Sequence, residues 1–228
     1  MKEHPVNDAF WHAKWRRNEI GFHEPRPNAF LLRHFAQMHF PAGARIFVPL
    51  CGKSLDIHWL LAQGFQVGGI ELSPIAVERL FAELGLSPRI TTLGALQRFD
   101  AGNLCIFVGN FFDLTRQDLG HVDGVYDRAA LIALPAAVRL RYARHLVSIT
   151  NAAPELLICL DYDQSCRPGP PFSVGEAEVR QHYEERFTLT CLERRDVPGG
   201  LKGACPATET VWKLVPRDAN PLPHSPGA

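Results

Sequence analysis

One stretch of the chain constrains its fold more than any other. An apolar run at residues 45–48 turns at Gly52 and passes into a helical pattern that begins near Ser54. A second apolar run follows at residues 66–71 and ends in a carboxylate, Glu71. Strand, tight turn, helix, strand and acid in this order build the nucleoside pocket of an open α/β sheet. There the glycine lets backbone approach the ligand, and the acid accepts hydrogen bonds from a ribose.

The rest of the chain continues this alternation of strand and helix. Further strand-like runs lie at residues 104–109, 122–127, 156–161, 188–195 and 208–214. Helical patterns lie at residues 54–63, 134–149 and 174–183, and Ser73-Pro74 begins another helix with an N-cap and a proline in its first turn. The last two strands have no helix between them, which predicts an antiparallel hairpin. We therefore expect an α/β, Rossmann-like protein with a doubly wound, mostly parallel seven-stranded sheet and a C-terminal antiparallel hairpin.

The domain organisation follows from length and from the placement of prolines. A chain of 228 residues can bury one full core, and we expect residues 1–215 to form a single domain. Residues 7–40 show helical periodicity with a proline break near residue 25, and they are expected to form a helical cover outside the sheet. The proline-rich residues 216–228 are expected to form a disordered tail.

Charge, hydropathy and cysteine usage argue against several classes of partner. The chain has 24 basic and 24 acidic residues, so it lacks the cationic excess of a nucleic-acid groove. It has no apolar run near the roughly 20 residues that cross a bilayer, and its N-terminus lacks the apolar core of a secretory signal. The six cysteines are scattered, which favours neither disulfides nor a metal site. We expect a cytoplasmic protein without nucleic-acid or membrane partners, and, since the chain shows no heptads, a monomer.

The single glycine of the first loop discriminates between nucleoside cofactors. A nicotinamide dinucleotide needs Gly-x-Gly-x-x-Gly, in which amides at a helix N-terminus hold a pyrophosphate, and a dehydrogenase is therefore disfavoured. A Walker loop is also absent, because Gly43 lies too far upstream of the Gly-Lys-Ser sequence. S-adenosyl-L-methionine carries an adenosine, a sulfonium and an amino-acid tail without a pyrophosphate. It fits a single-glycine loop best.

Glycines and polar residues follow several strands on one side of the predicted sheet. They are residues 50–53, Glu71, residues 109–110 and residues 127–128. Ligands of open α/β sheets bind beyond the carboxyl ends of the strands, where the strand order reverses. We therefore expect these residues to converge on one site.

Seven short motifs, each weak alone, run from residue 10 to about residue 215. They are Trp11-x-x-x-Trp15, Gly21-Phe-His23, Val48-Pro-Leu-Cys-Gly-Lys-Ser54, Gly69-Ile-Glu-Leu-Ser73, Phe112-Asp-Leu114, Tyr126-Asp-Arg-Ala-Ala-Leu131 and Pro168-Gly-Pro-Pro-Phe172. Together and in this order they resemble the thiopurine S-methyltransferase family. The resemblance implies a class I methyltransferase fold, S-adenosyl-L-methionine as donor, and methyl transfer to the sulfur of an aromatic or heterocyclic thiol. Bacterial relatives of the family are also associated with methylation of selenium and tellurium species.

The donor side of the predicted site combines loop and helix residues. Leu50 and Gly52 are expected to bring backbone to the methionine half of the cofactor, and Glu71 to hold the ribose. The resemblance implies that the N-terminal helix covers the cofactor, with Trp11 and Trp15 near its methionine end, where the lid would keep water from the sulfonium.

Asn110 and Phe111 follow the strand that ends at Gly109, where an adenine would lie. We expect backbone contacts from Asn110 and ring packing from Phe111. Arg128 is expected to lie within reach of the cofactor as well.

The acceptor side is predicted from three residues. Phe22 is a candidate flat wall against which an aromatic thiol stacks, and Pro170 belongs to a rigid rim over the acceptor. Arg128 is the candidate catalytic residue, because a guanidinium stabilises a thiolate or binds a carboxylate or ring nitrogen in bidentate fashion. Three interpretations remain open at this point: an aromatic thiol as acceptor, a selenium or tellurium species as acceptor, or a non-catalytic cofactor-binding module.

Overall fold

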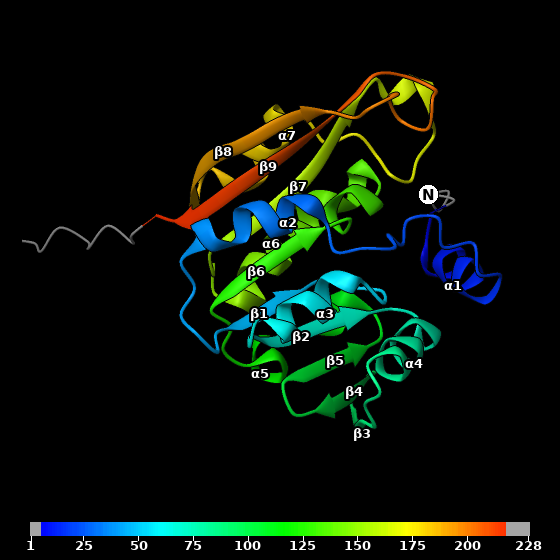
Figure 1. Cartoon of the computed structure of the whole chain (residues 1–228), viewed down its shortest axis with the longest axis vertical. Helices are drawn as coiled ribbons and strands as arrows, with labels where there is room; N and C mark the ends of the chain where they lie inside the picture. The colour runs from blue at the N-terminus through cyan, green and yellow to red at the C-terminus, as the bar shows by residue number, and fades with distance from the viewer. Residues whose placement is uncertain (1–5, 218–228) are drawn as a thin grey trace, which may run out of the picture.

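The computed structural model describes residues 6–217, which form helices on both faces of one twisted sheet (Figure 1). The helices are α1 (Asp8–Arg16), α2 (Ala29–His34), α3 (Leu55–Ala62), α4 (Pro74–Glu83), α5 (Arg116–Leu119), α6 (Ala136–Thr150) and α7 (Glu176–Tyr183). Four short 3₁₀ turns are η1 (Phe35–Met38), η2 (Phe111–Asp113), η3 (Leu131–Ala133) and η4 (Gln164–Cys166). The predicted tail at residues 216–228 lies outside the described residues, apart from Pro216, which ends the last strand, and Arg217.

The sheet has nine strands within the described residues. They are β1 (Arg45–Val48), β2 (Gln66–Glu71), β3 (Arg89–Leu93), β4 (Leu96–Ala101), β5 (Leu104–Val108), β6 (Gly124–Arg128), β7 (Glu155–Tyr162), β8 (Phe187–Asp196) and β9 (Ala207–Pro216). Their order is β3-β4-β5-β2-β1-β6-β7-β9-β8. The five central strands are parallel, and the pairs at both edges are antiparallel, including the expected hairpin of β8 and β9.

In the described part of the chain, the sheet has nine strands rather than the expected seven, and the two additional strands, β3 and β4, form one hairpin. Strands β3 and β4 turn at Gly94 and extend the sheet beyond β5. Their signal in the sequence is weak because most side chains of β3 are exposed, and only Leu96 and Phe99 of β4 are buried. A mostly solvated edge hairpin lacks the apolar run or the clean alternation that marks a strand.

Two apolar layers lie on opposite faces of the sheet. On one face, Ile46 and Val48 of β1 pack with residues of α2, α3 and α4. On the other face, Phe47 packs with residues of α6 and α7. This alternation along β1 buries both sides of the parallel strands, which explains their nearly continuous apolar sequences.

The N-terminal segment divides into two parts. Helix α2 belongs to the sheet-covering layer, since Phe30 and Leu31 are buried in the core beside β1. Helix α1 lies on the side toward which the arrows of β5 and β6 point (Figure 1). Of this N-terminal segment, α1 and the linker after it are therefore the parts placed to cover a ligand at the strand ends.

Ser73 differs from the expectation at the start of α4. It occupies the N-cap position, and Pro74 is the first helical residue, as predicted. Its buried hydroxyl, however, makes no hydrogen bond within the described residues. Its backbone N–H instead donates to Glu71 (2.8 Å), so a carboxylate from the preceding strand stabilises this helix start.

Within residues 6–217, no helix combines the length and apolar character that a membrane span requires.

Candidate functional site

The turn after β1 has an unusual backbone. Leu50 has a φ of +45° and Gly52 a φ of +53°, both in the left-handed region. For a bulky residue such as Leu50 this conformation is rare, and it persists where the surroundings impose it. The Cys51 N–H donates to the Ile70 carbonyl (3.0 Å), which ties the turn to β2. A Cβ at Gly52 would lie 3.2 Å from Cζ2 of Trp15, so the glycine allows the indole to pack directly on the turn.

Glu71 holds this corner together through both of its oxygens. One accepts the N–H of Gly52 (2.9 Å) and the other accepts the N–H of Ser73 (2.8 Å). Burial raises the pKa of the carboxyl, and the backbone N–H groups oppose that shift. A carboxylate has about four lone-pair sites. Glu71 therefore fixes the turn and retains the acceptor capacity that its predicted role at a ribose requires.

Three aromatic rings form a cluster that contacts the turn through Trp15. Phe22 makes edge contacts with Trp11 and with Trp15, both with centroids 5.6 Å apart. Trp15 is buried, whereas Phe22 is 39% exposed. The structure thus brings together the two predicted lid residues and the predicted acceptor wall, and it leaves part of the Phe22 ring open.

The loop after β5 anchors the cover helix. Asn110 Oδ1 accepts the N–H of Phe112 (2.9 Å), and its Nδ2 donates to Asp8 at the start of α1 (3.2 Å). These two bonds fix the Asn110 side chain at the end of β5, and the expected backbone contact of Asn110 with the cofactor stays a prediction. The ring of Phe111 is buried against Tyr142, with centroids 4.8 Å apart, so it belongs to the core rather than to an open adenine surface.

Arg128 lies at the end of β6 between two carboxylates. Its Nε donates to Oδ2 of Asp56 (3.2 Å), and its Nη2 lies 3.3 Å from Oε2 of Glu24. Its side chain is 13% exposed. Burial raises the pKa of Glu24, and the nearby guanidinium opposes that shift. Arg128 therefore has fixed geometry and a largely balanced charge.

The sequence analysis did not identify Asp56, which is the centre of this cluster. Its carboxylate is 1% exposed and accepts hydrogen bonds from the Asn28 N–H (2.6 Å) and the Tyr126 hydroxyl (3.0 Å), besides Arg128. In the sequence it is an acid in the first turn of a helix, a common position with a local explanation. Its partners come from two segments far from it in the chain, the start of α2 and strand β6, so no local pattern could have revealed them.

Asp127, the neighbour of Arg128, has a structural position. It is fully buried and accepts hydrogen bonds from the Tyr142 hydroxyl (2.6 Å) and the Leu131 N–H (3.3 Å). Burial raises its pKa to about 6. These bonds fix the loop that follows β6 and with it the backbone from which Arg128 projects.

The proline loop is attached to that same segment. Phe172 donates its N–H to the carbonyl of Ile132 in η3 (2.7 Å), and the Tyr162 hydroxyl donates to the carbonyl of Pro171 (2.7 Å). Pro170, the predicted rim residue, is half-buried. These bonds hold the loop beside η3, which begins three residues after Arg128.

The candidate site thus lies at the carboxyl edge of the parallel strands, between the ends of β1 and β6. The strand order reverses there, since β2 continues from β1 on one side and β7 from β6 on the other. Ligands of doubly wound sheets bind at this position. No cluster of three potential metal-binding side chains occurs among residues 6–217.

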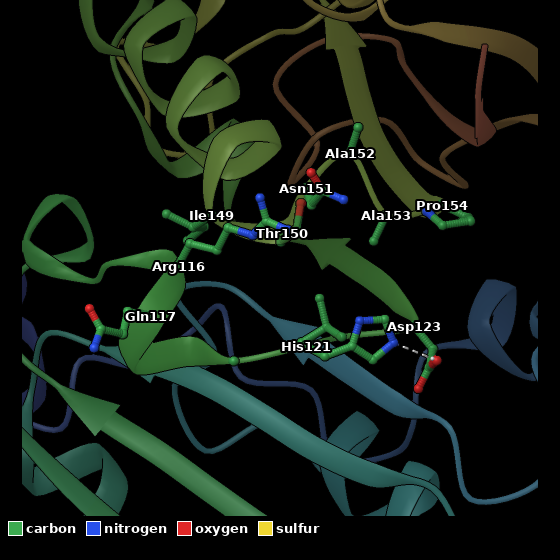
Figure 2. Close-up of a pocket in the computed structure, with 12 residues that line it drawn as sticks. Arg116, Gln117, His121, Asp123, Ile149, Thr150, Asn151, Ala152, Ala153 and Pro154 are labelled. Carbon is green, nitrogen blue, oxygen red and sulfur yellow. Dashed lines mark hydrogen bonds and ion pairs between the residues drawn. The ribbon is translucent and has the colours of Figure 1, made fainter. Parts of the chain in front are cut away.

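A separate pocket of about 730 Å³ opens at the opposite edge of the sheet (Figure 2). It is lined by the segments that precede β6 and β7, including Asp123 and Pro154. His121 Nε2 and Asp123 Oδ1 are joined by a hydrogen bond there (3.1 Å). None of the predicted site residues lines this pocket, and its place at the amino ends of the strands argues against a role in cofactor binding.

Comparisons with known proteins find similar sequences that extend over most of the chain. The family model described as thiopurine S-methyltransferase matches residues 6–209. A protein named thiopurine S-methyltransferase from Gluconobacter oxydans is 58% identical over 210 residues, covering 92% of this chain and 96% of that protein. A protein of the same name from Xanthobacter autotrophicus is 55% identical over 206 residues, covering 90% of this chain and 97% of that protein.

Solved structures share the fold at low sequence identity. A SAM-dependent methyltransferase from Anabaena variabilis aligns with a TM-score of 0.62 at 15% identity, covering 94% of this chain and 98% of that chain. The 1,6-didemethyltoxoflavin-N1-methyltransferase of Burkholderia thailandensis, solved with S-adenosylhomocysteine, aligns with a TM-score of 0.61 at 14% identity, covering 94% and 92%. These likenesses confirm the expected class of α/β fold.

Proposed function

The chain belongs to the thiopurine S-methyltransferase family, whose members are S-adenosyl-L-methionine-dependent methyltransferases, and from this premise we propose that it methylates the sulfur of aromatic or heterocyclic thiols. The observation that carries the proposal is the junction at the ends of β1 and β6. The Gly52 turn, braced by Glu71 and covered by Trp15, lies there beside the Arg128 cluster. One half of this junction suits a nucleoside cofactor, and the other suits a polar or anionic acceptor.

The donor half fits S-adenosylmethionine on three counts. Gly52 lacks a side chain where backbone would meet the ligand, and Glu71 keeps lone pairs for two hydroxyls. Trp15 packs on the turn, and Trp11 lies beside it through Phe22, so the two indoles would help to keep water from a bound sulfonium. When bound, the cofactor supplies an electrophilic methyl group on a sulfonium.

The residues of this chain would contribute alignment rather than proton transfer. Methyl transfer is an in-line displacement, and positioning two reactants can supply roughly 7–11 kcal/mol toward such a barrier. Phe22 offers the exposed part of its ring to an aromatic acceptor, and Pro170 bounds the space from the side of η3. An aryl thiol ionises readily, so the site needs no strong base.

Arg128 would orient the acceptor through its hydrogen-bond donors. A guanidinium has five N–H groups, and its ion pairs with Asp56 and Glu24 do not exhaust them. Because the two carboxylates offset its charge, direct stabilisation of a thiolate by Arg128 is weaker than for an unpaired arginine. Its contribution is therefore expected mainly in acceptor binding.

The proposal is tested by calorimetric titration with S-adenosylmethionine and by a methylation assay with labelled donor. We expect binding of the cofactor and faster turnover of aryl thiols than of selenite or tellurite. Absence of cofactor binding would refute a methyltransferase role, and preference for the oxyanions would assign the acceptor to the selenium and tellurium class. We expect Arg128→Ala to lower kcat/KM for a thiol more than it weakens cofactor binding. An unchanged kcat/KM would remove Arg128 from the site.

A further inference from the structure

Arg128 has two carboxylate partners that differ in how firmly each is held. Asp56 is 1% exposed and is fixed by the Asn28 N–H and the Tyr126 hydroxyl, in addition to Arg128. The side chain of Glu24 is 44% exposed and lies 3.3 Å from Nη2 of Arg128. Asp56 is therefore a permanent partner, whereas Glu24 forms an ion pair of the partly solvated kind, which contributes little stability.

Glu24 contacts Arg128 on the side where the proposed acceptor would bind. It lies two residues after Phe22, in the linker between α1 and α2, and a hydrogen bond from the His23 N–H to the Ile20 carbonyl (2.8 Å) turns the chain just before it. The same linker thus carries the exposed ring of Phe22 and the carboxylate of Glu24, which pairs with Arg128. A ring with an acidic substituent would carry both features in one molecule.

We propose that Glu24 is a specificity-determining residue of the acceptor site. Its carboxylate lies against Nη2 of Arg128, and the acidic group of an acceptor must displace it to pair with this nitrogen. For an aromatic thiol that also carries a carboxylate, Glu24 therefore acts as an internal competitor, and the wild-type site favours uncharged aromatic thiols over acidic ones. This inference rests on the proposed function, in which Arg128 faces the acceptor.

Competition of this kind has a calculable effect. Removing the negative charge of Glu24 frees Nη2 of Arg128 while Asp56 continues to hold Nε. Partly exposed ion pairs contribute up to about 1 kcal/mol, which corresponds to roughly fivefold in an equilibrium constant. An acidic acceptor should therefore bind Glu24→Gln about fivefold more tightly than the wild type.

The test compares 4-mercaptobenzoate with its methyl ester, which share the ring and the sulfur and differ in one negative charge. At a pH where both thiols are ionised, we expect Glu24→Gln to raise the ratio of kcat/KM for the acid to kcat/KM for the ester about fivefold, through KM. Glu19→Gln is the matched control: Glu19 is 47% exposed and pairs with Lys14 rather than with Arg128 (2.7 Å). We expect this control to leave the ratio unchanged, and thermal unfolding checks that both variants fold.

Calorimetry with 4-mercaptobenzoate in the presence of S-adenosylhomocysteine gives a readout that does not require turnover. A lower Kd for Glu24→Gln supports the inference even if neither thiol is methylated, a result that would overturn the proposed function alone. An unchanged ratio together with an unchanged Kd overturns the role of Glu24. An equal gain for acid and ester also overturns it, because Arg128 would then face the thiolate rather than a second acidic group.

Discussion

Replacement of Asp56 by alanine should destabilise the protein more than any other single change of an acidic residue near the site. The change leaves three donors without their acceptor: the Asn28 N–H, the Tyr126 hydroxyl and the Arg128 Nε. Removing one partner of a buried ion pair typically costs 3–5 kcal/mol, because the remaining charge is left without a partner. Arg128 retains Glu24 and some contact with water, so we expect the lower half of this range, about 3–4 kcal/mol.

The assay is urea-induced unfolding, with thermal unfolding as a second measurement. For a chain of this length, a loss of about 3–4 kcal/mol lowers Tm by roughly 6–16 °C. Asp56→Asn keeps the size of the side chain and one acceptor oxygen, so it should lose less stability. It should still raise the KM for a thiol, because Arg128 loses its fixed partner.

Asp113→Asn is the control, since Asp113 is exposed at the same edge of the sheet, in η2. We expect it to change the free energy of unfolding by less than about 0.5 kcal/mol. A loss below about 1 kcal/mol for Asp56→Ala would refute the reasoning. It would mean that solvent replaces the carboxylate without penalty and that Asp56 does not hold Arg128 in place.

Three further perturbations test other parts of the site. Gly52→Ala should weaken S-adenosylmethionine binding in calorimetry and lower Tm, because a left-handed alanine costs roughly 1–2 kcal/mol and its Cβ would lie 3.2 Å from Trp15. Gly64→Ala, at φ +84° with nothing within 4 Å, measures the backbone part alone, and equal effects of the two on cofactor binding would contradict the role of the turn. Burial raises the pKa of Asp127 from 3.8 to about 6, so its folded form binds a proton more tightly than its unfolded form. Its contribution to stability should therefore be lost as pH rises through that window, and Asp127→Asn should flatten this part of a pH series of urea unfolding. Phe22→Ala should raise the KM for an aromatic thiol with little change in Tm, since the ring is 39% exposed; an unchanged KM would remove Phe22 from the acceptor wall.

The central sheet was predictable because strands that are buried on both faces have nearly continuous apolar sequences. The residues of β1 and β7 are almost all apolar, and each such run is followed or preceded by a helical pattern. The β3–β4 hairpin lacks such an apolar run, because its outer strand, β3, is mostly exposed to solvent. The N-cap expected at Ser73 was also incomplete, since the Ala76 N–H that such a hydroxyl could accept is bonded to the Ser73 carbonyl instead (3.1 Å).

The two halves of the site were predictable to different degrees because they are assembled differently. The donor corner lies within residues 45–71, and its main hydrogen bond joins Gly52 to Glu71 across a single strand–helix–strand unit. A local pattern can therefore encode it. The acceptor cluster joins Glu24, Asp56 and Arg128 from three separate segments, and the contacts of Arg128 with Asp56 and Glu24 span 72 and 104 positions.

This difference in assembly has a functional consequence. Substitutions in the donor corner disturb backbone hydrogen bonds that the fold itself uses, as the contacts of Glu71 with Gly52 and Ser73 illustrate. Glu24, in contrast, lies on a linker between two helices and makes one partly solvated ion pair, so it can change at little expense in stability. Acceptor preference can therefore vary through the linker while the cofactor corner and the buried pair of Asp56 with Arg128 stay in place. On this reasoning, Glu24→Gln should alter the choice between charged and uncharged thiols without altering the affinity for S-adenosylmethionine.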